Sequence, residues 1–179
     1  GVSSLVASVL AARKLSDPEA ARAFLNPNLV SLPDPDGIPG MAAAADRLVR
    51  AAHAGETVWV YTDYDVDGVT SAALLSEFFR ESRIRHQTRL PRRDREGYGI
   101  NAAALQEVAD QGGTVVVTAD TGISSVTEAR FARELGLDLV ITDHHTPGPE
   151  LPDAVALVNP KLPGSTYPDA MIAGVGVAW

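Results

Sequence analysis

Short apolar runs alternate with longer amphipathic stretches from residue 56 onward. The runs are rich in Val, Ile and Leu and are bounded by turn residues, a pattern that predicts buried β-strands. We expect five strands, at residues 58–61, 84–90, 115–118, 137–142 and 155–158. The stretches between them predict helices at residues 70–82, 101–111 and 125–135. Because strands and helices alternate, the expected fold class is α/β, with a mostly parallel five-stranded sheet and flanking helices.

The first 55 residues have a different pattern, which predicts helices without strands. Helical spacing of apolar residues runs through residues 2–13 and 42–53, and Ser16-Asp17-Pro18-Glu19 is a helix-start signal with proline in the first turn. We therefore expect a helical N-terminal segment at residues 1–55 and an α/β domain at residues 56–179.

Composition limits the kinds of site that the chain can form. The 179 residues contain no cysteine, have a mean hydropathy near zero, and include no apolar run as long as a membrane span. Disulfides and thiolate metal sites are therefore excluded within this sequence. Any metal must be held by oxygen and imidazole, which suits Mn²⁺ or Mg²⁺ better than structural zinc. These features, with no secretory signal pattern, indicate a cytoplasmic protein without membrane association.

Three aspartates follow directly on the first predicted strand. They are Asp63, Asp65 and Asp67. We expect the carboxylates to lie on a loop that leads into a helix starting near Thr70. Carboxylates crowded at the end of a buried strand repel one another unless a cation lies among them. The alternative interpretation is a solvated acidic turn.

Two further strands end in residues that can bind metal ions. Asp120 follows the third predicted strand, and the triplet Asp143-His144-His145 follows the fourth. If the strands are parallel, all three clusters meet at one edge of the sheet. Oxygen ligands with one or two imidazoles predict a pair of Mn²⁺ or Mg²⁺ ions that can bind a phosphoryl group and produce a hydroxide nucleophile. Each feature alone has a plainer explanation, because strand-end aspartates and adjacent surface histidines are common.

The net charge of −8 is unfavourable for nucleic-acid binding, but the charges are unevenly distributed. Residues 80–95 hold seven arginines against two acidic residues, a local excess of five positive charges. The arginines are Arg80, Arg83, Arg85, Arg89, Arg92, Arg93 and Arg95. Clustered arginine beside clustered carboxylate suits a metal-dependent phosphodiester site. The alternative is a solvated helix end and strand edge.

The order of the three strand-end motifs resembles that of the DHH phosphoesterase superfamily. The motifs are Asp-Tyr-Asp-Val-Asp-Gly at residues 63–68, Asp-Thr-Gly at residues 120–122 and Asp-His-His at residues 143–145. Within the superfamily, the chain is most similar to the RecJ exonucleases, over nearly its whole length. The further similar segments are Phe24-Leu25-Asn26-Pro27, Pro91-Arg92-Arg93, Glu96-Gly97-Tyr98-Gly99, Asn159-Pro160-Lys161 and Ala173-Gly174-Val175-Gly176. This resemblance implies 5′-to-3′ exonuclease activity on single-stranded DNA in recombination and repair, with single-strand-binding protein as a partner.

The resemblance also implies a ligand set for two Mn²⁺ or Mg²⁺ ions. Asp65 and Asp67 would bind metal, with Asp63 as a nearby or alternate ligand. Asp120 would bridge the ions, and His144 would be a further ligand.

Other residues would act on the substrate. His145 would contact the scissile phosphate as charge develops on it, and Asp143 would orient a histidine. Arg93, with Arg92 beside it, would bind a substrate phosphate. Tyr98 would either stack on a base or fill a turn.

The sequence departs from the family pattern in two respects that affect function. Tyr61 stands where some superfamily members have a metal-binding histidine. A fourth motif with another aspartate ligand would follow residue 179, so we expect a piece of a longer protein that is nearly inactive alone. The alternatives are a DHH phosphodiesterase for short oligonucleotides or cyclic dinucleotides, and a non-catalytic relative that acts as a binding module.

Overall fold

The computed structural model describes residues 1–92 and 94–179, so the prediction for Arg93 lies outside the described residues. The chain divides into two units, Gly1–Asp34 and Pro35–Trp179. The first contains helices α1 (Ser4–Ala12) and α2 (Pro18–Leu25) and a 3₁₀ turn at Leu29–Ser31. The side chain of Asp17 caps α2 by accepting a hydrogen bond from the Ala20 N–H at 2.8 Å, as the helix-start signal predicts.

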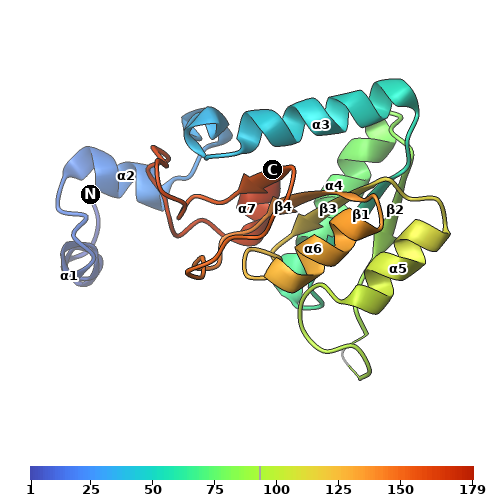
Figure 1. Ribbon diagram of the computed structural model, residues 1–179. Helices are drawn as coiled ribbons and strands as arrows, with labels where there is room; N and C mark the ends of the chain where they lie inside the picture. The colour runs from blue at the N-terminus through green and yellow to red at the C-terminus, as the bar shows by residue number, and fades with distance from the viewer. Residues whose placement is uncertain (93) are drawn as a thin grey trace. The chain divides into compact units, whose positions relative to one another are not determined.

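The second unit is built on a parallel sheet, which has five strands in the described residues (Figure 1). The strands are β1 (Val58–Thr62), β2 (His86–Arg89), β3 (Val115–Ala119), β4 (Asp138–Thr142) and β5 (Ala156–Val158). Their order in the sheet is β2-β1-β3-β4-β5, and every pair is parallel. The expected α/β fold class is confirmed, and each strand lies within two residues of its expected bounds.

Helices cover both faces of this sheet (Figure 1). The helices are α3 (Met41–Ala54), α4 (Val66–Glu81), α5 (Ala102–Asp110), α6 (Val126–Glu134) and α7 (Gly174–Ala178), with a 3₁₀ turn at Pro35–Gly37 before α3. Side chains alternate along each strand, so that Val58 and Val60 pack with α3, α4 and α7, whereas Trp59 and Tyr61 pack with α5 and α6. Strands β1, β3 and β4 are buried on both faces and therefore read as nearly continuous apolar runs, whereas β2 is polar and partly exposed.

Helix α3 belongs to the second unit, where it packs against β5. The domain boundary expected at residue 55 stays a prediction. Within residues 1–92 and 94–179, no helix combines the length and the apolar character needed to cross a membrane.

The helix after β1 begins four residues earlier than the sequence analysis expected. Asp65 caps α4, because its Oδ1 accepts a hydrogen bond from the Gly68 N–H at 2.9 Å. A Cβ at Gly68 would lie 2.3 Å from the Asp63 carbonyl oxygen, so glycine permits this tight entry into the helix. Asp67 therefore lies in the first turn of α4, and its expected place on a loop was wrong.

Candidate metal centre

The residues expected to bind metal follow strand ends that lie side by side. Thr62 of β1 pairs with Ala119 of β3, which in turn pairs with Thr142 of β4. The residues that follow these three are Asp63, Asp120 and Asp143. The chain order reverses between β1 and β3, and parallel α/β sheets commonly bind ligands at such a point. The register thus brings the three predicted motifs to one sheet edge.

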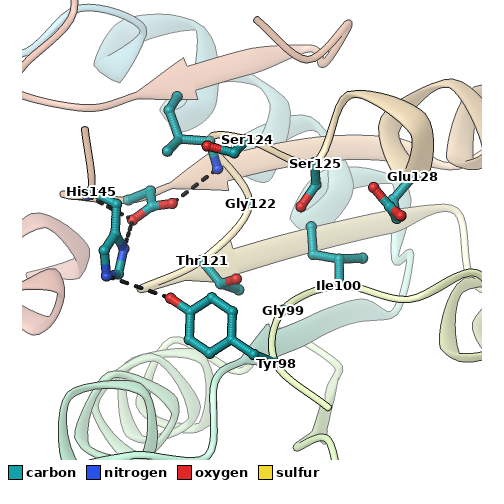
Figure 2. A pocket seen from close by; sticks show the side chains of 11 residues that line it. Tyr98, Gly99, Ile100, Thr121, Gly122, Ser124, Ser125, Glu128 and His145 are labelled. Carbon is teal, nitrogen blue, oxygen red and sulfur yellow. Dashed lines mark hydrogen bonds and ion pairs between the residues drawn. The ribbon is translucent and has the colours of Figure 1, made fainter. Parts of the chain in front are cut away.

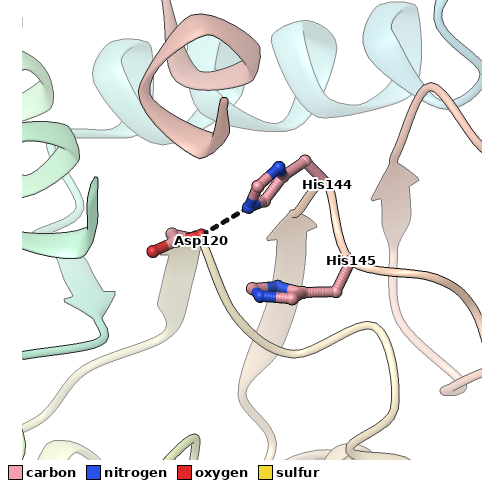
Figure 3. Close-up of side chains that lie close together, drawn as sticks. All are labelled: Asp120, His144 and His145. Atoms are coloured by element: carbon pink, nitrogen blue, oxygen red, sulfur yellow. Dashed lines mark ion pairs between the residues drawn. The ribbon is translucent and has the colours of Figure 1, made fainter. Parts of the chain in front are cut away.

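Asp120 and His144 meet at this edge, with His145 beside them (Figure 3). Asp120 Oδ1 lies 3.1 Å from His144 Nε2, and one ligand atom from each of the three residues lies within 4.8 Å of the others. Asp120 has a left-handed φ of 60°, which aspartate adopts more readily than most residues. His144 Nδ1 lies 3.0 Å from the Ile172 carbonyl oxygen, which only accepts, so Nδ1 carries the proton and Nε2 faces Asp120.

Asp67 also contacts His144 and so joins Asp120 and His144 in one cluster of candidate ligands. Its Oδ2 lies 3.6 Å from His144 Nε2. The two carboxylate oxygens also accept hydrogen bonds from the backbone, at 2.8 Å from the Gly174 nitrogen and 2.7 Å from the Val175 nitrogen. Asp67 is therefore held at the sheet edge by a segment more than 100 residues away in the sequence.

The electrostatics of the group favour a bound cation. Burial, together with the charges of Asp67 and Asp65, raises the pKa of Asp120 to about 7. Burial likewise raises the pKa of Asp63, whose Oδ1 accepts a hydrogen bond from the Tyr64 N–H at 2.7 Å. Asp120 Oδ1 is buried and accepts no hydrogen bond from the residues that the structure describes. A buried carboxylate oxygen without a donor is costly, and a divalent cation would satisfy it, so these residues fit a metal of this kind.

Asp143 organises the loop that carries the two histidines. Its Oδ1 accepts hydrogen bonds from the backbone N–H groups of His144 at 2.7 Å and His145 at 3.0 Å, and lies 2.7 Å from His145 Nδ1. Its Oδ2 accepts one from the Ile123 N–H at 2.9 Å, which ties the end of β4 to the loop after β3. The imidazole of His145 is thereby fixed through Nδ1, and Nε2 is left for other partners.

Two polar side chains that the sequence analysis gave no role support the same loop. Asn159 Nδ2 donates to the His145 carbonyl oxygen at 2.9 Å, and Lys161 Nζ donates to the His144 carbonyl oxygen at 2.5 Å. Asn159 directly follows β5, whose last residue Val158 pairs with Thr142. Asn159 is therefore a polar residue at the end of a strand adjacent to β4, and this position could have identified it from the sequence as a candidate site residue.

A cavity of about 380 Å³ opens beside His145 (Figure 2). The Tyr98 hydroxyl lies 3.5 Å from His145 Nε2, and the two rings meet edge to face with centroids 6.3 Å apart. The wall opposite is formed by the loop after β3 and the first turn of α6, including Ser124, Ser125 and Glu128 (Figure 2). Tyr98 and His145 thus both line the cavity, and 59% of the Tyr98 surface is exposed.

The arginine cluster is paired with acids to a large extent. Arg89 bonds to Glu96 at 2.7 Å and to Glu107 at 3.1 Å, and it is largely buried. Arg92 makes two bonds to Asp94 on the surface, at 3.2 and 3.1 Å. Exposed ion pairs of this kind contribute little energy, so a phosphate can replace the Asp94 partner of Arg92 more readily than the partners of Arg89.

Comparison with known proteins decides the family. Residues 57–179 match the model of the DHH family, N-terminal domain. The chain belongs to the DHH family. It is 45% identical over 178 residues to the single-stranded-DNA-specific exonuclease RecJ of Bacillus subtilis, and 37% identical over 143 residues to that of Escherichia coli. These alignments cover 99% and 79% of this chain but 23% and 25% of the relatives, so this DHH chain spans about a quarter of their length.

Solved structures of relatives share the fold of this DHH chain. A crystal structure of exonuclease RecJ bound to manganese superposes with a TM-score of 0.72 and 32% identity, over 79% of this chain and 36% of that protein. RecJ from Thermus thermophilus in complex with Mn²⁺ also gives a TM-score of 0.72, with 27% identity over 97% of this chain and 23% of that protein. The resemblance to RecJ drawn from the sequence motifs is confirmed.

Proposed function

We propose that this chain is the metal-binding part of a phosphodiesterase that degrades single-stranded DNA from its 5′ end. The observation that supports this most strongly is the meeting of Asp67, Asp120 and His144 at one sheet edge, in a chain whose relatives are single-strand-specific exonucleases. The relatives known for this activity are about four times as long as this chain, so the activity is proposed for a protein of that length.

Two Mn²⁺ or Mg²⁺ ions are the proposed cofactors. Asp65, Asp67, Asp120 and His144 would hold them, with Asp63 as a nearby or alternate ligand. Asp120 would lie between the ions, which accords with its buried and unsatisfied Oδ1. When bound, such ions lower the pKa of a water nucleophile and withdraw charge from a phosphoryl group.

The chain's own residues would bind and orient the DNA. His145, oriented by the contact of its Nδ1 with Asp143, would contact an oxygen of the scissile phosphate through Nε2 and stabilise the charge that develops there. Tyr98, exposed beside His145, would stack on a base at the mouth of the cavity. Arg92 and Arg93 would bind a neighbouring phosphate.

The proposed setting of this activity is recombination and repair, as the resemblance to the RecJ family implies. Single-stranded DNA arises in recombination and repair, where single-strand-binding protein covers it, so that protein is the proposed partner. The cytoplasm is the proposed location.

Replacement of Asp120 in the full-length parent tests the proposal. Asp120→Ala should abolish Mn²⁺-dependent release of mononucleotides from 5′-ended single-stranded DNA, whereas Asp110→Ala, an exposed carboxylate on α5, should leave it unchanged. Full activity of the Asp120 variant would rule out the assignment. Preferred hydrolysis of dinucleotides or cyclic dinucleotides would favour the second enzyme class, and DNA binding without hydrolysis would favour a binding module.

A further inference from the structure

The segment at residues 172–175 contacts three of the side chains in the candidate metal centre. Its Ile172 carbonyl oxygen lies 3.0 Å from His144 Nδ1 and so fixes which nitrogen of that ring carries the proton. Two residues later, the Gly174 and Val175 N–H groups donate to opposite oxygens of Asp67 at 2.8 and 2.7 Å. The orientation of two candidate ligands is thus determined by backbone atoms of one short stretch.

The third contact depends on the absence of a side chain at position 174. A Cβ placed on Gly174 would lie 2.7 Å from both Cβ and Oδ1 of Asp120 and 2.9 Å from its Cγ. Non-bonded carbon atoms do not approach so closely, so any larger residue would force the two groups apart. Asp120 is 1% exposed and has little space in which to yield.

We propose that Gly174 is a positioning residue for the metal centre, where it allows one backbone segment to hold Asp67 and His144 against Asp120. This inference rests on the proposed function, because it assumes that these side chains bind metal. It assigns a physical role to the glycine-rich stretch at residues 173–176, which otherwise forms only the start of α7.

The geometry makes the expected effect specific to metal binding. A methyl group at position 174 must move the backbone away from Asp120. Since the Gly174 N–H holds Asp67, the same movement carries Asp67 away from Asp120 and His144. Metal ligands need to be held close to their final positions, and loss of supporting contacts typically lowers metal affinity about 10- to 100-fold.

Gly176 provides a matched control on the same helix. A Cβ there would meet the Ile172 side chain, at 2.5 Å from Cγ1 and 2.8 Å from Cδ1. Those atoms belong to a side chain that can change rotamer without moving the Ile172 carbonyl oxygen, and no atom of a candidate ligand is among the nearest atoms to a Cβ at Gly176. Gly174→Ala and Gly176→Ala therefore make the same chemical change in α7, but only the first moves the carboxylates.

The test measures the affinity of the 179-residue chain for Mn²⁺. The electron paramagnetic resonance signal reports the concentration of free Mn²⁺ during the titration. We expect Gly174→Ala to weaken Mn²⁺ binding at least tenfold and Gly176→Ala to change it less than twofold, at a temperature where circular dichroism shows all three proteins folded. Equal affinity of wild type and Gly174→Ala would overturn the positioning role alone. An equal loss in both variants would also overturn it, because helix packing would then be the cause. Absence of Mn²⁺ binding by the wild type would overturn both this inference and the proposed metal centre.

A second measurement does not depend on the variants folding. In the wild-type chain, titration with diamagnetic Mg²⁺ should shift the amide signals of Gly174 and Val175 in nuclear magnetic resonance spectra, with the same midpoint as the Asp120 amide. Their hydrogen-bond acceptor is a proposed ligand, so metal binding must change their surroundings. Unchanged Gly174 and Val175 signals, while the Asp120 signal moves, would contradict the proposal.

Discussion

Asp120 and Asp143 are both buried at the same sheet edge, yet their surroundings are opposite. The oxygens of Asp143 accept hydrogen bonds from three backbone N–H groups and contact His145 Nδ1. Asp120 has an oxygen with no donor among the described residues and has Asp67 and Asp65 as electrostatic neighbours. Hydrogen bonds to a carboxylate stabilise a fold, whereas an unsatisfied buried carboxylate costs stability. Asp120 thus costs stability that a bound cation would recover, whereas Asp143 stabilises the loop.

Replacing Asp120 by asparagine should therefore have two opposite effects. Without metal, Asp120→Asn removes a buried charge beside other carboxylates and should stabilise the chain by about 1–3 kcal/mol. This corresponds to a rise in unfolding temperature of about 2–4 °C for each kcal/mol in a chain of this size. With Mn²⁺ present, the wild type should gain stability from the ion and the variant should not. Differential scanning calorimetry with and without Mn²⁺ measures both effects, and a metal-free variant less stable than wild type would contradict the argument.

Asp143→Asn should instead destabilise the chain whether metal is present or not. An asparagine offers one acceptor oxygen, so its NH₂ group would face an N–H donor that Asp143 now satisfies. We expect a loss of about 1–3 kcal/mol in urea unfolding. Asp153→Asn serves as the control, because Asp153 is exposed and its ion pair with Arg133 lies on the surface. Equal stability of the two variants would show that the Asp143 hydrogen bonds contribute little.

At the scale of the elements, acidic residues have different partners at the edge of the sheet where the strands begin and at the edge where they end. At the edge where the strands begin, Arg47 of α3 is buried and bonds to Glu56 at 2.8 Å and to Asp138 at 2.5 Å. Thr114 also donates to Glu56. These contacts tie α3 to the entries of β1, β3 and β4. The carboxylates at the opposite edge have no arginine partner among the described residues, which is why that edge is the one suited to a cation.

The charge on Glu56 gives the stability of the chain a defined pH dependence. The hydrogen bond from Arg47, with that from Thr114, holds the pKa of Glu56 below its ordinary value of 4.5. A lowered carboxyl pKa stabilises the fold above that ordinary value, and the stabilisation is lost as the pH falls through the folded-state pKa. Glu56→Gln should therefore cost about 1 kcal/mol at pH 7, and this cost should decrease as the pH falls through the lowered pKa of Glu56.

Urea unfolding at a series of pH values from about 7 downward tests this dependence. Glu134→Gln on α6 provides the control, since Glu134 is exposed and the change should have little effect at any of these pH values. A cost of Glu56→Gln that persists unchanged at the lowest pH would show that the charge is not its source.

Strands β1, β3 and β4 could be predicted from sequence because they are buried on both faces, and the candidate ligands because they follow these strands. The start of α4 could not, since it depends on Asp65 capping Gly68 and on the space that Gly68 leaves for the Asp63 carbonyl. The contacts of Gly174 with Asp67 and Asp120 also could not, because they join residues far apart in the sequence. Periodicity reports which residues are buried, but it does not report which backbone groups meet in space.

At the scale of the whole molecule, the candidate site lies entirely within one of the two units. Every strand in the described residues, and every candidate ligand, belongs to Pro35–Trp179. The site therefore needs no side chain from Gly1–Asp34 for its ligand set. Helix α3 is required, since Arg47 on it pairs with Glu56 and Asp138 beside the strands.

Deletion of residues 1–34 should accordingly leave the metal centre intact, whereas deletion of residues 1–55 should not. The first truncation keeps α3 and the whole sheet, so we expect a folded chain with wild-type Mn²⁺ affinity by calorimetric titration. The second removes α3 with Arg47 and leaves Asp138 without its buried partner, a loss comparable to breaking a partly buried ion pair in addition to the lost packing. We expect this chain to unfold at a clearly lower temperature and to bind Mn²⁺ weakly. The contacts of Arg47 indicate that α3 supports the sheet. If the two truncations behave alike, this inference is wrong.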